Sequence, residues 1–447
     1  MKSCCPAERA GDYGWSPVLA GRTQANALEA VRAIGDALQA TVAGLGTPGH
    51  VPAPDPSLAG GMCGVALFFA QLSKLTGDAA DRECALTLLE TALGVLQPEA
   101  VGIGLLRGTC GVAWTVQHLA EMLHEPGLSC TLDEFDHNLM QIVQGQSKWR
   151  YRFDIFDGLV GIGVYALERI PQSCALELVE CVIHRLAAHA ENATNGVLWD
   201  RLPADATSAH SRLRAPKAEP YVDLGMARGM ASVIAFLAQV RRNSLVDEDV
   251  GDLLSRAVSQ LLSYRQSTDT GGYFPYLGTS AIKPVRTSWC YGDLGIGTAL
   301  RLAAEAQPDA GWYNIATEIL ADISTVDVGE DPLADACVCH GAAGVGHILT
   351  RTYHATGNPG FARSACRWFS RVLDESRRWP SGVGGFRFYW NGQWVPIPGL
   401  LRGAAGVGLA LLSAASDVAP DWDRLLLMSF RSPEDTGPTS GPDRKVS

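Results

Sequence analysis

The segment from Gly341 to Tyr353 has the sequence GAAGVGHILTRTY, and its pattern predicts the fold of most of the chain. Gly341, Gly344 and Gly346 stand at the start of an apolar stretch with helical character. Residues three or four apart lie on one face of a helix, so these glycines leave that face almost without side chains. Each glycine costs about 1 kcal/mol of helix propensity. The pattern therefore indicates a helix whose first turn must approach its neighbours closely.

The same pattern, Gly-x-x-Gly-x-small before an apolar stretch, recurs through the chain, with a degenerate fourth copy, Gly229-x-x-Ser232. The first glycines of the seven copies are Gly61, Gly108, Gly158, Gly229, Gly292, Gly341 and Gly403. They are separated by 47, 50, 71, 63, 49 and 62 residues, which is typical of a repeat protein. Each interval has room for a second helix, for example at 81–96 and at 177–190. Each repeat is therefore predicted to be a helix pair.

A helix-pair repeat either extends as an open solenoid or closes into a ring. Glycine starts on every inner helix favour closure, because closure gathers seven helix N-termini around one mouth. We expect an all-α fold, an α/α toroid over residues 51–430, between an N-terminal helical lead-in at 1–50 and a disordered tail at 431–447. Small β-hairpin insertions are expected at 271–276 and at 384–394, the second turning at Asn391-Gly392. Residues 191–221 have room for a larger excursion.

Composition narrows the classes of partner. The chain has 447 residues, 47% of them hydrophobic, and a net charge of −11, which argues against nucleic acid and anionic membranes and favours a cationic peptide. The longest apolar run, 58–70, is too short to span a membrane, and the N-terminus has no apolar core of a secretory signal. We therefore expect a cytoplasmic protein without a membrane span. Most of its twelve cysteines are expected to be reduced and buried, or to bind metal.

Metal-ligating side chains stand at the starts of two successive repeats. Repeat five contains Trp289-Cys290-Tyr291-Gly292, and repeat six contains Cys339-His340-Gly341. Two thiolates and one imidazole form a Cys₂His zinc set with an open fourth position, the pattern of a catalytic site. The sequence contains no Cys-x-x-Cys pair, which argues against a zinc finger. Cys337 is the one local rival as a ligand.

These residues make the chain resemble the lanthionine synthetase C-like family, the cyclases of class I lanthipeptide biosynthesis. The resemblance covers residues 60–416 and is carried by Arg286-x-x-Trp289-Cys290-Tyr291-Gly292, by Cys339-His340-Gly341 and by the glycine turns. It implies a toroid of seven inner and seven outer helices and one Zn²⁺ per chain. The implied zinc ligands are Cys290, Cys339 and His340. The implied catalytic residues are Arg286, Tyr291 and Asp154, the last within the acidic turn Asp154-Ile155-Phe156-Asp157-Gly158.

The resemblance also implies a reaction. In this family a cysteine thiol of a precursor peptide adds to dehydroalanine or dehydrobutyrine, which closes a (methyl)lanthionine thioether ring in antibiotic biosynthesis. The implied substrate is a dehydrated precursor peptide with its leader, and the implied partners are a lanthipeptide dehydratase and the export transporter. Zinc deprotonates the thiol. The addition forms an enolate, and the candidates to stabilise it are Arg286, Arg228 and Tyr291. Asp154 is the candidate to orient one of these residues or to accept the thiol proton.

One position departs from the family. Its usual Ala-His-Gly is here Ala227-Arg228-Gly229, and arginine does not titrate near neutral pH, so water or Tyr291 must supply the proton. A degenerate homologue that only binds the peptide or the dehydratase is therefore the alternative. Other toroid enzymes fit less well. A glycosidase needs paired carboxylates, which only Asp154 and Asp157 offer, and the zinc ligands of a prenyltransferase do not fall in this pattern.

Overall fold

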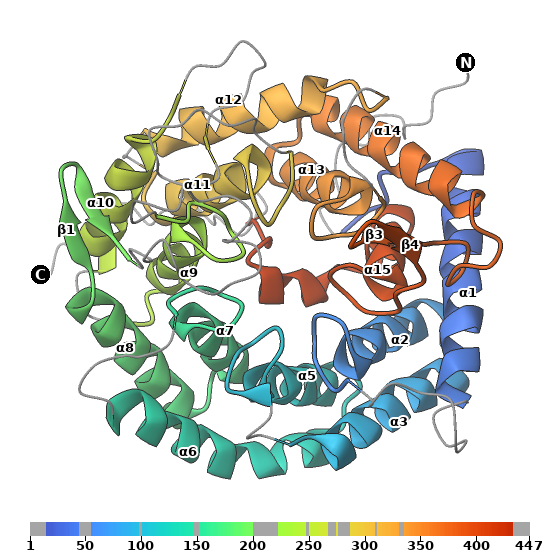
Figure 1. Cartoon of the computed structure of the whole chain (residues 1–447), viewed down its shortest axis with the longest axis horizontal. Helices are drawn as coiled ribbons and strands as arrows, with labels where there is room; N and C mark the ends of the chain where they lie inside the picture. The colour runs from blue at the N-terminus through green and yellow to red at the C-terminus, as the bar shows by residue number, and fades with distance from the viewer. Residues whose placement is uncertain are drawn as a thin grey trace, which may run out of the picture.

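The computed structural model describes residues 15–43, 55–97, 101–145, 152–199, 222–246, 250–266, 274–275, 287–308, 311–329 and 335–431. Within these residues the chain forms two concentric rings of helices (Figure 1). The only strands in the described residues belong to two small antiparallel hairpins. The predicted all-α toroid with hairpin insertions is therefore confirmed.

The inner ring has seven helices in the described part of the chain, and each begins directly after the first glycine of a repeat. They are α2 (Met62–Thr76), α5 (Thr109–Met122), α7 (Leu159–Arg169), α9 (Met230–Arg242), α11 (Asp293–Ala306), α13 (Ala342–Thr356) and α15 (Ala404–Ala415). Each packs against the next, and α15 packs against α2. The first and last repeats thus meet, and the repeat closes into a ring instead of extending as a solenoid.

The outer ring surrounds the inner one (Figure 1). Over the described ranges its helices are α1 (Gly21–Ala43), α3 (Ala79–Val95), α6 (Leu132–Gly145), α8 (Ser173–Ala188), α10 (Val250–Leu262), α12 (Trp312–Thr325) and α14 (Pro359–Ser376). A short 3₁₀ helix, η1 (Pro126–Thr131), precedes α6. Six of the seven outer helices in the described residues pack against the inner helix that precedes them in the ring, whereas α6 packs against α8 and against η1, which in turn packs against α5. The expected lead-in at 1–50 contains α1, which packs against α15 and so completes the outer ring.

The glycines that follow the first glycine of a repeat permit three close approaches. A Cβ at Gly344 would lie 1.9 Å from the carbonyl oxygen of Val338, in the turn before the same helix. A Cβ at Gly64 would lie 2.8 Å from the Cβ of Leu400, in the neighbouring repeat. A Cβ at Gly346 would meet the Phe369 ring of α14 at 3.0 Å. Glycine therefore lets each helix start pack against its own turn, the adjacent repeat and the outer ring.

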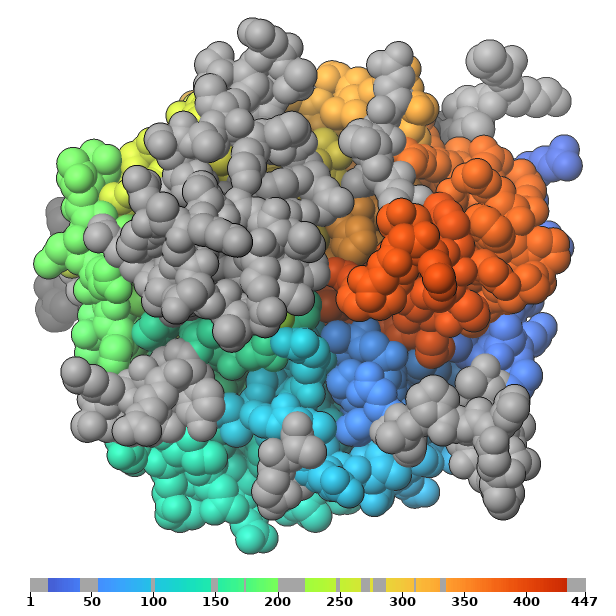
Figure 2. Space-filling view, in the orientation of Figure 1, coloured from blue at the N-terminus to red at the C-terminus, as the bar shows by residue number. Residues whose placement is uncertain are grey.

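The two hairpins lie between repeats. Strands β1 (Glu191–Ala193) and β2 (Gly196–Leu198) pair within the region predicted to hold an excursion. Strands β3 (Phe388–Trp390) and β4 (Gln393–Val395) pair around Asn391 and Gly392, whose φ angles of 49° and 85° suit the expected tight turn. The hairpin expected at 271–276 lies largely outside the described residues. In Figure 2 the β3–β4 hairpin lies in the orange-red part of the visible face.

A C-terminal segment (residues 417–431) runs through the centre of the ring. It contains the 3₁₀ helix η3 (Asp421–Leu426), the red segment beside α15 in Figure 1. Its side chains and backbone form hydrogen bonds or ion pairs with every inner helix. The partners are Lys74, His118, Glu168, Arg242, Glu305, Arg351 and Ser413, one from each of α2, α5, α7, α9, α11, α13 and α15. The segment thus ties the inner helices together.

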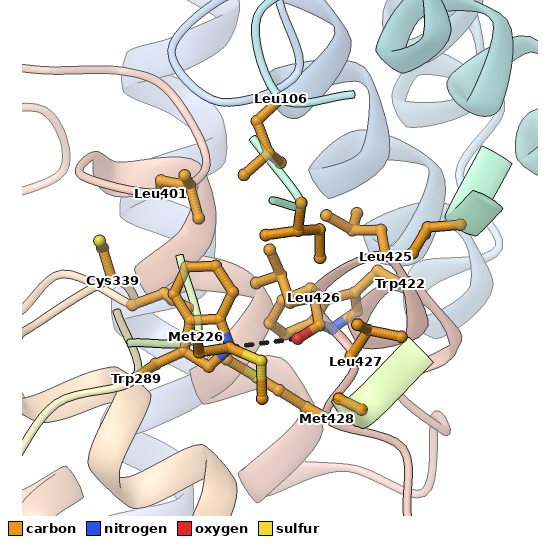
Figure 3. Close-up of a cluster of buried hydrophobic side chains, with 14 of the residues drawn as sticks. Leu106, Met226, Trp289, Cys339, Leu401, Trp422, Leu425, Leu426, Leu427 and Met428 are labelled. Carbon is orange, nitrogen blue, oxygen red and sulfur yellow. Dashed lines mark hydrogen bonds between the residues drawn. The ribbon is translucent and has the colours of Figure 1, made fainter. Parts of the chain in front are cut away.

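The C-terminal segment is also apolar on the side that faces the glycine turns. Leu426 and Met428 pack in a cluster with Trp289 and Leu401, which belong to the turns before α11 and α15 (Figure 3). The indole Nε1–H of Trp289 donates to the carbonyl of Leu426 at 3.1 Å. Cys339 lies at the edge of this cluster, with its sulfur pointing away from it (Figure 3). The cluster therefore forms a dry floor beneath the turns that carry the candidate metal ligands.

The ten cysteines in the described residues all have free thiols. Burial raises the pKa of Cys63 to about 12, and it also raises the pKa of Cys110. Such thiols act as small hydrophobic side chains. Within the part of the chain that the structure describes, every helix falls short of the length and hydrophobicity that crossing a bilayer requires.

Candidate metal centre

Backbone hydrogen bonds link the glycine turns into a second, smaller ring. In each repeat the residue concerned stands two before the first glycine. These residues are Ala59, Leu106, Phe156, Ala227, Cys290, Cys339 and Leu401. Six backbone N–H···O bonds of 2.8–3.2 Å join neighbouring members of this set. Each residue donates its amide to the carbonyl of the next in the order Ala227, Cys290, Cys339, Leu401, Ala59, Leu106 and Phe156. The turns are therefore held at fixed spacing around the mouth of the toroid.

The link between repeats three and four is made by side chains instead. The amide of Phe156 donates to the Asp154 carboxylate at 2.9 Å. The guanidinium of Arg152 donates to the carbonyl of Arg228 at 2.8 Å, and it also bonds Asp154. Charged side chains therefore concentrate at this one point of the ring.

The predicted zinc ligands come together where two neighbouring links of the ring meet. The amide of Cys290 donates to the carbonyl of Cys339 at 3.2 Å. The two Sγ atoms and a ring nitrogen of His340 all lie within 4.8 Å of one another. A tetrahedral zinc ion with bonds of about 2.3 Å to sulfur holds its ligand atoms about 3.8 Å apart. The three side chains therefore fit a zinc ion with only small adjustments, and one position remains for a further ligand.

The electrostatics of the two sulfurs also suit a metal. The thiol of Cys339 donates a hydrogen bond to Cys290, which lowers the pKa of Cys290 well below its usual range, and the nearby His340 acts in the same direction. The same hydrogen bond raises the pKa of Cys339, and burial adds to this effect. Both residues are buried, 6% and 3% exposed. The site thus already stabilises one thiolate in a place where a cation would stabilise two.

The rival ligand Cys337 lies in a second cluster that shares His340. Ligand atoms of Asp335, Cys337 and His340 also fall within 4.8 Å of one another. Burial raises the pKa of Cys337 well above its usual value, and Asp335 adds to this effect. The Asp335 carboxylate is already engaged, because it accepts the amides of Cys337 and Tyr389 at 2.9 and 3.0 Å. This second cluster is therefore the poorer metal site.

Tyr291 follows Cys290 directly and is buried, 8% exposed. Its hydroxyl donates to the carboxylate of Asp223 at 3.0 Å. Burial and Asp223 raise the pKa of Tyr291 well above its usual value, so the phenol keeps its proton. Burial raises the pKa of Asp223 to about 6, although the Gly225 amide and Arg152 favour its ionised form.

Asp154 and Arg228 meet at the side-chain link between repeats three and four. Asp154 is 1% exposed, and one of its oxygens accepts the amides of Phe156 and Asp157 at 2.9 Å each. The guanidinium of Arg228 lies 3.0 Å from the Asp157 carboxylate and 3.7 Å from that of Asp154. Burial opposes ionisation of Asp157, but Arg107 and Arg228 hold its pKa below the usual value. Asp154 thus stabilises its turn as well as pairing with arginines.

Of the predicted site residues, the structure brings Cys290, Cys339 and His340 into one cluster, and Asp154 and Arg228 into another. Tyr291 adjoins the first cluster in sequence, and Arg286 lies outside the described residues. The sequence reasoning missed Asp223 and Arg152. A signal for Asp223 was present, since aspartate stands six residues before the first glycine in repeats one, four and six. These are Asp55, Asp223 and Asp335.

Comparisons with known proteins agree with this geometry. A family model described as "Lanthionine synthetase C-like protein" matches residues 52–427. The fold is similar to that of a solved structure named "Nisin cyclase", with a TM-score of 0.70 and 16% sequence identity over 90% of this chain and 97% of that one. No curated protein sequence matches the chain. The family match includes every residue of both clusters.

Proposed function

The chain belongs to the lanthionine synthetase C-like family, and from that premise we propose that it is a zinc-dependent lanthipeptide cyclase. It closes (methyl)lanthionine rings by adding a cysteine thiolate of a precursor peptide to dehydroalanine or dehydrobutyrine. The observation that carries this proposal is the meeting of Cys290, Cys339 and His340 on adjacent turns of the closed ring. The three ligands leave a fourth position for the peptide sulfur, as in catalytic zinc sites.

Cys290, Cys339 and His340 would hold the ion. When bound, zinc supplies the charge that keeps the peptide thiol deprotonated at neutral pH. The protein adds two thiolates of its own, so the site as a whole stays electron-rich and the peptide sulfur keeps its nucleophilicity. The floor beneath the turns excludes water from below, because Trp289 and the C-terminal segment fill it.

Addition of the thiolate leaves negative charge on the substrate carbonyl, and the proposed roles of the remaining residues concern that charge. Arg228 and Arg286 are the proposed cations that stabilise it, and Tyr291 is the proposed donor of the proton. Asp154 is proposed to orient Arg228, which lies 3.7 Å from its carboxylate. Since Arg228 does not titrate near neutral pH, it stabilises the charge and does not deliver the proton.

The proposed substrate is a flexible peptide, dehydrated beforehand, that carries its leader. The net charge of −11 favours a cationic peptide and opposes nucleic acid. The reaction needs a dehydratase to supply the dehydroamino acids, which makes that enzyme the proposed partner, with the export transporter as a further one. We place this chemistry in the cytoplasm, where the free thiols of the chain remain reduced.

The test is ring closure by the purified, zinc-loaded chain. The probe is a synthetic peptide with one dehydroalanine and one cysteine, and its free thiol is counted by alkylation and mass spectrometry. Ring formation removes the thiol without changing the peptide mass, and Cys290→Ala should abolish it. Equal rates with and without protein would contradict the proposal. If the peptide nevertheless bound tightly, that result would favour the scaffold function, for which the replacement of histidine by Arg228 is the supporting observation.

A further inference from the structure

An aspartate six residues before the first glycine performs the same structural task in three repeats. In Asp55, Asp223 and Asp335 one carboxylate oxygen accepts the amide two residues later, at 2.8, 2.9 and 2.9 Å. In each case the backbone carbonyl of the aspartate accepts the first amide of the inner helix, at 2.8, 2.9 and 3.1 Å. One oxygen of each carboxylate is therefore sufficient to hold the turn.

The second oxygen of the carboxylate distinguishes the three repeats. Asp55 is exposed. The second oxygen of Asp335 accepts the amide of Tyr389, which anchors the β3–β4 hairpin. The second oxygen of Asp223 accepts the hydroxyl of Tyr291 at 3.0 Å, across an interval of 68 residues and next to the zinc ligand Cys290. Among these three, Asp223 is the aspartate whose second oxygen binds the side chain that directly follows a proposed zinc ligand.

The pair formed by Asp223 and Tyr291 is rigid and buried. A Cβ at Gly225 would lie 2.6 Å from the Tyr291 ring and 2.5 Å from the Cys290 carbonyl oxygen, so the turn presses directly against both residues. The amide of Ala227 donates to the same carbonyl at 3.1 Å. The phenol therefore has little freedom to rotate away from Asp223.

We propose that Asp223 is a positioning residue for ring closure, which fixes the Tyr291 hydroxyl beside the metal centre. The inference rests on the proposed function and names the residue that holds Tyr291, the proposed proton donor, in place. The surroundings support this role, because Asp223 is buried, 6% exposed, and its two carboxylate oxygens accept the Gly225 amide and the Tyr291 hydroxyl. An aspartate that only held a turn would need no such burial, as the exposed Asp55 shows.

A double-mutant cycle tests this coupling in the zinc-loaded protein. The probe is the synthetic peptide with one dehydroalanine and one cysteine. Tyr291→Phe and Asp223→Asn should each slow ring closure by about 10–100-fold while zinc content stays near that of wild type. The double variant should be no slower than Tyr291→Phe, because Asp223 acts only through the phenol. Independent effects that multiply in the double variant would overturn the inference.

The chain supplies its own control and a readout other than rate. Asp55→Asn changes the same turn in repeat one and should leave the rate within about twofold. Asp223→Ser can still accept the Gly225 amide but cannot reach the phenol, so it should match Asp223→Asn. With ¹³C-labelled tyrosine, the resonance lost in Tyr291→Phe should shift in both Asp223 variants and stay fixed in Asp55→Asn.

The outcomes separate the two claims. If the wild-type protein closes no ring above the rate of the peptide alone, the proposed function fails. If wild type is active and Asp223→Asn is equally active, only the present inference fails. An unshifted Tyr291 resonance in Asp223→Asn would likewise show that the carboxylate does not position the phenol.

Discussion

Arg228 occupies the position for which the family resemblance implies histidine, and its contacts define what it can do there. Its guanidinium pairs with Asp157 and lies over the ring of Phe156, 4.6 Å from the centroid. Arg228→Ala should slow ring closure by about 10–100-fold without loss of zinc, because repeat four supplies no metal ligand. Arg107→Ala is the control, since Arg107 has the same place in repeat two, also pairs with Asp157, and is 57% exposed. An equal loss of rate in both variants would show that Arg228 contributes only a surface ion pair with Asp157, as Arg107 does.

Asp223 also predicts how stability depends on pH. Its pKa rises from an ordinary 3.8 to about 6 on folding, through burial, while Arg152 and Tyr291 favour ionisation and Asp154 opposes it. The folded state therefore binds more protons than the unfolded state between these values, so stability from this group is full below pH 3.8 and is lost as pH rises through 6. At pH 7 the loss is at most about 3 kcal/mol.

The measurement is the melting temperature of Asp223→Asn relative to wild type across this range of pH. The melting temperature of the variant should rise relative to that of wild type as the pH increases from 4 to 7, because the neutral amide of asparagine never ionises. Asp55→Asn, at an exposed site, should show no such trend. A constant difference between Asp223→Asn and wild type would mean that Asp223 ionises normally in the folded protein.

Residues of this kind mark the limit of what the sequence could predict at the site. Cys290, Cys339 and His340 were predictable, because each lies within two residues of a repeat's first glycine and the repeat places those positions together. Asp223 and Arg152 are single polar residues in turns, and their partners lie 68 and 76 residues away. The repeated aspartate marks Asp223 as a turn residue, but its contact with Tyr291 depends on which turns the closed ring places side by side.

At the scale of elements, the inner helices were more predictable than the rest. A Cβ at six of the first glycines would lie 2.1–2.4 Å from backbone atoms, and the seventh, Gly292, has a φ of 109°. The seven helices begin where the repeat predicts. The outer helices α3 and α8 lie within a few residues of the predicted 81–96 and 177–190. The β1–β2 hairpin was expected only as an excursion, since its short strands, Glu191–Ala193 and Gly196–Leu198, carry little alternation of polar and apolar residues.

The glycine argument makes a direct prediction for α13. Gly344→Ala places a methyl group 1.9 Å from the Val338 carbonyl oxygen, and backbone cannot yield as a flexible side chain would. The substitution should lower the free energy of unfolding by about 2–3 kcal/mol and should weaken zinc binding, because Val338 precedes the ligand Cys339. Gly94→Ala is the matched control. Gly94 is exposed in the outer helix α3 with no atom near its Cβ position, so alanine should stabilise by about 0.5–1 kcal/mol. Urea denaturation measures the free energy of unfolding of both variants. Similar changes in Gly344→Ala and Gly94→Ala would contradict the proposed role of the repeat glycines.

At the scale of the whole molecule, the C-terminal segment (residues 417–431) connects inner helices that belong to different repeats. Asp423 is fully buried and accepts two bonds from Arg351, at 2.6 and 2.7 Å, and one from Ser429 at 2.6 Å, and its second oxygen lies 2.7 Å from Nε2 of His347. The arginine and the histidine lower its pKa against the opposing effect of burial. The sequence did not predict this arrangement, because the segment belongs to no repeat and its partners are spread over the whole ring.

Asp423→Asn should therefore destabilise the entire toroid. It leaves Arg351 without its counter-charge in a largely buried site, an effect of about 3–5 kcal/mol. Asp421→Asn is the control two residues away, since the Asp421 side chain is 48% exposed and pairs with Lys74 at 3.4 Å; its effect should be below about 1 kcal/mol. Chemical denaturation measures both. Equal free energies of unfolding in the two variants would show that the C-terminal segment does not stabilise the closed ring.

The central claim is that the closed ring assembles one zinc site from Cys290, Cys339 and His340, and metal analysis combined with X-ray absorption tests it most directly. The account predicts one zinc per chain, with two sulfur ligands at about 2.3 Å and a nitrogen ligand at about 2.0 Å in the protein without substrate. Cys339→Ala should lose the metal, whereas Cys337→Ala, two residues away, should keep it with the same sulfur shell. Full zinc content in Cys339→Ala, or loss of zinc in Cys337→Ala alone, would contradict the account.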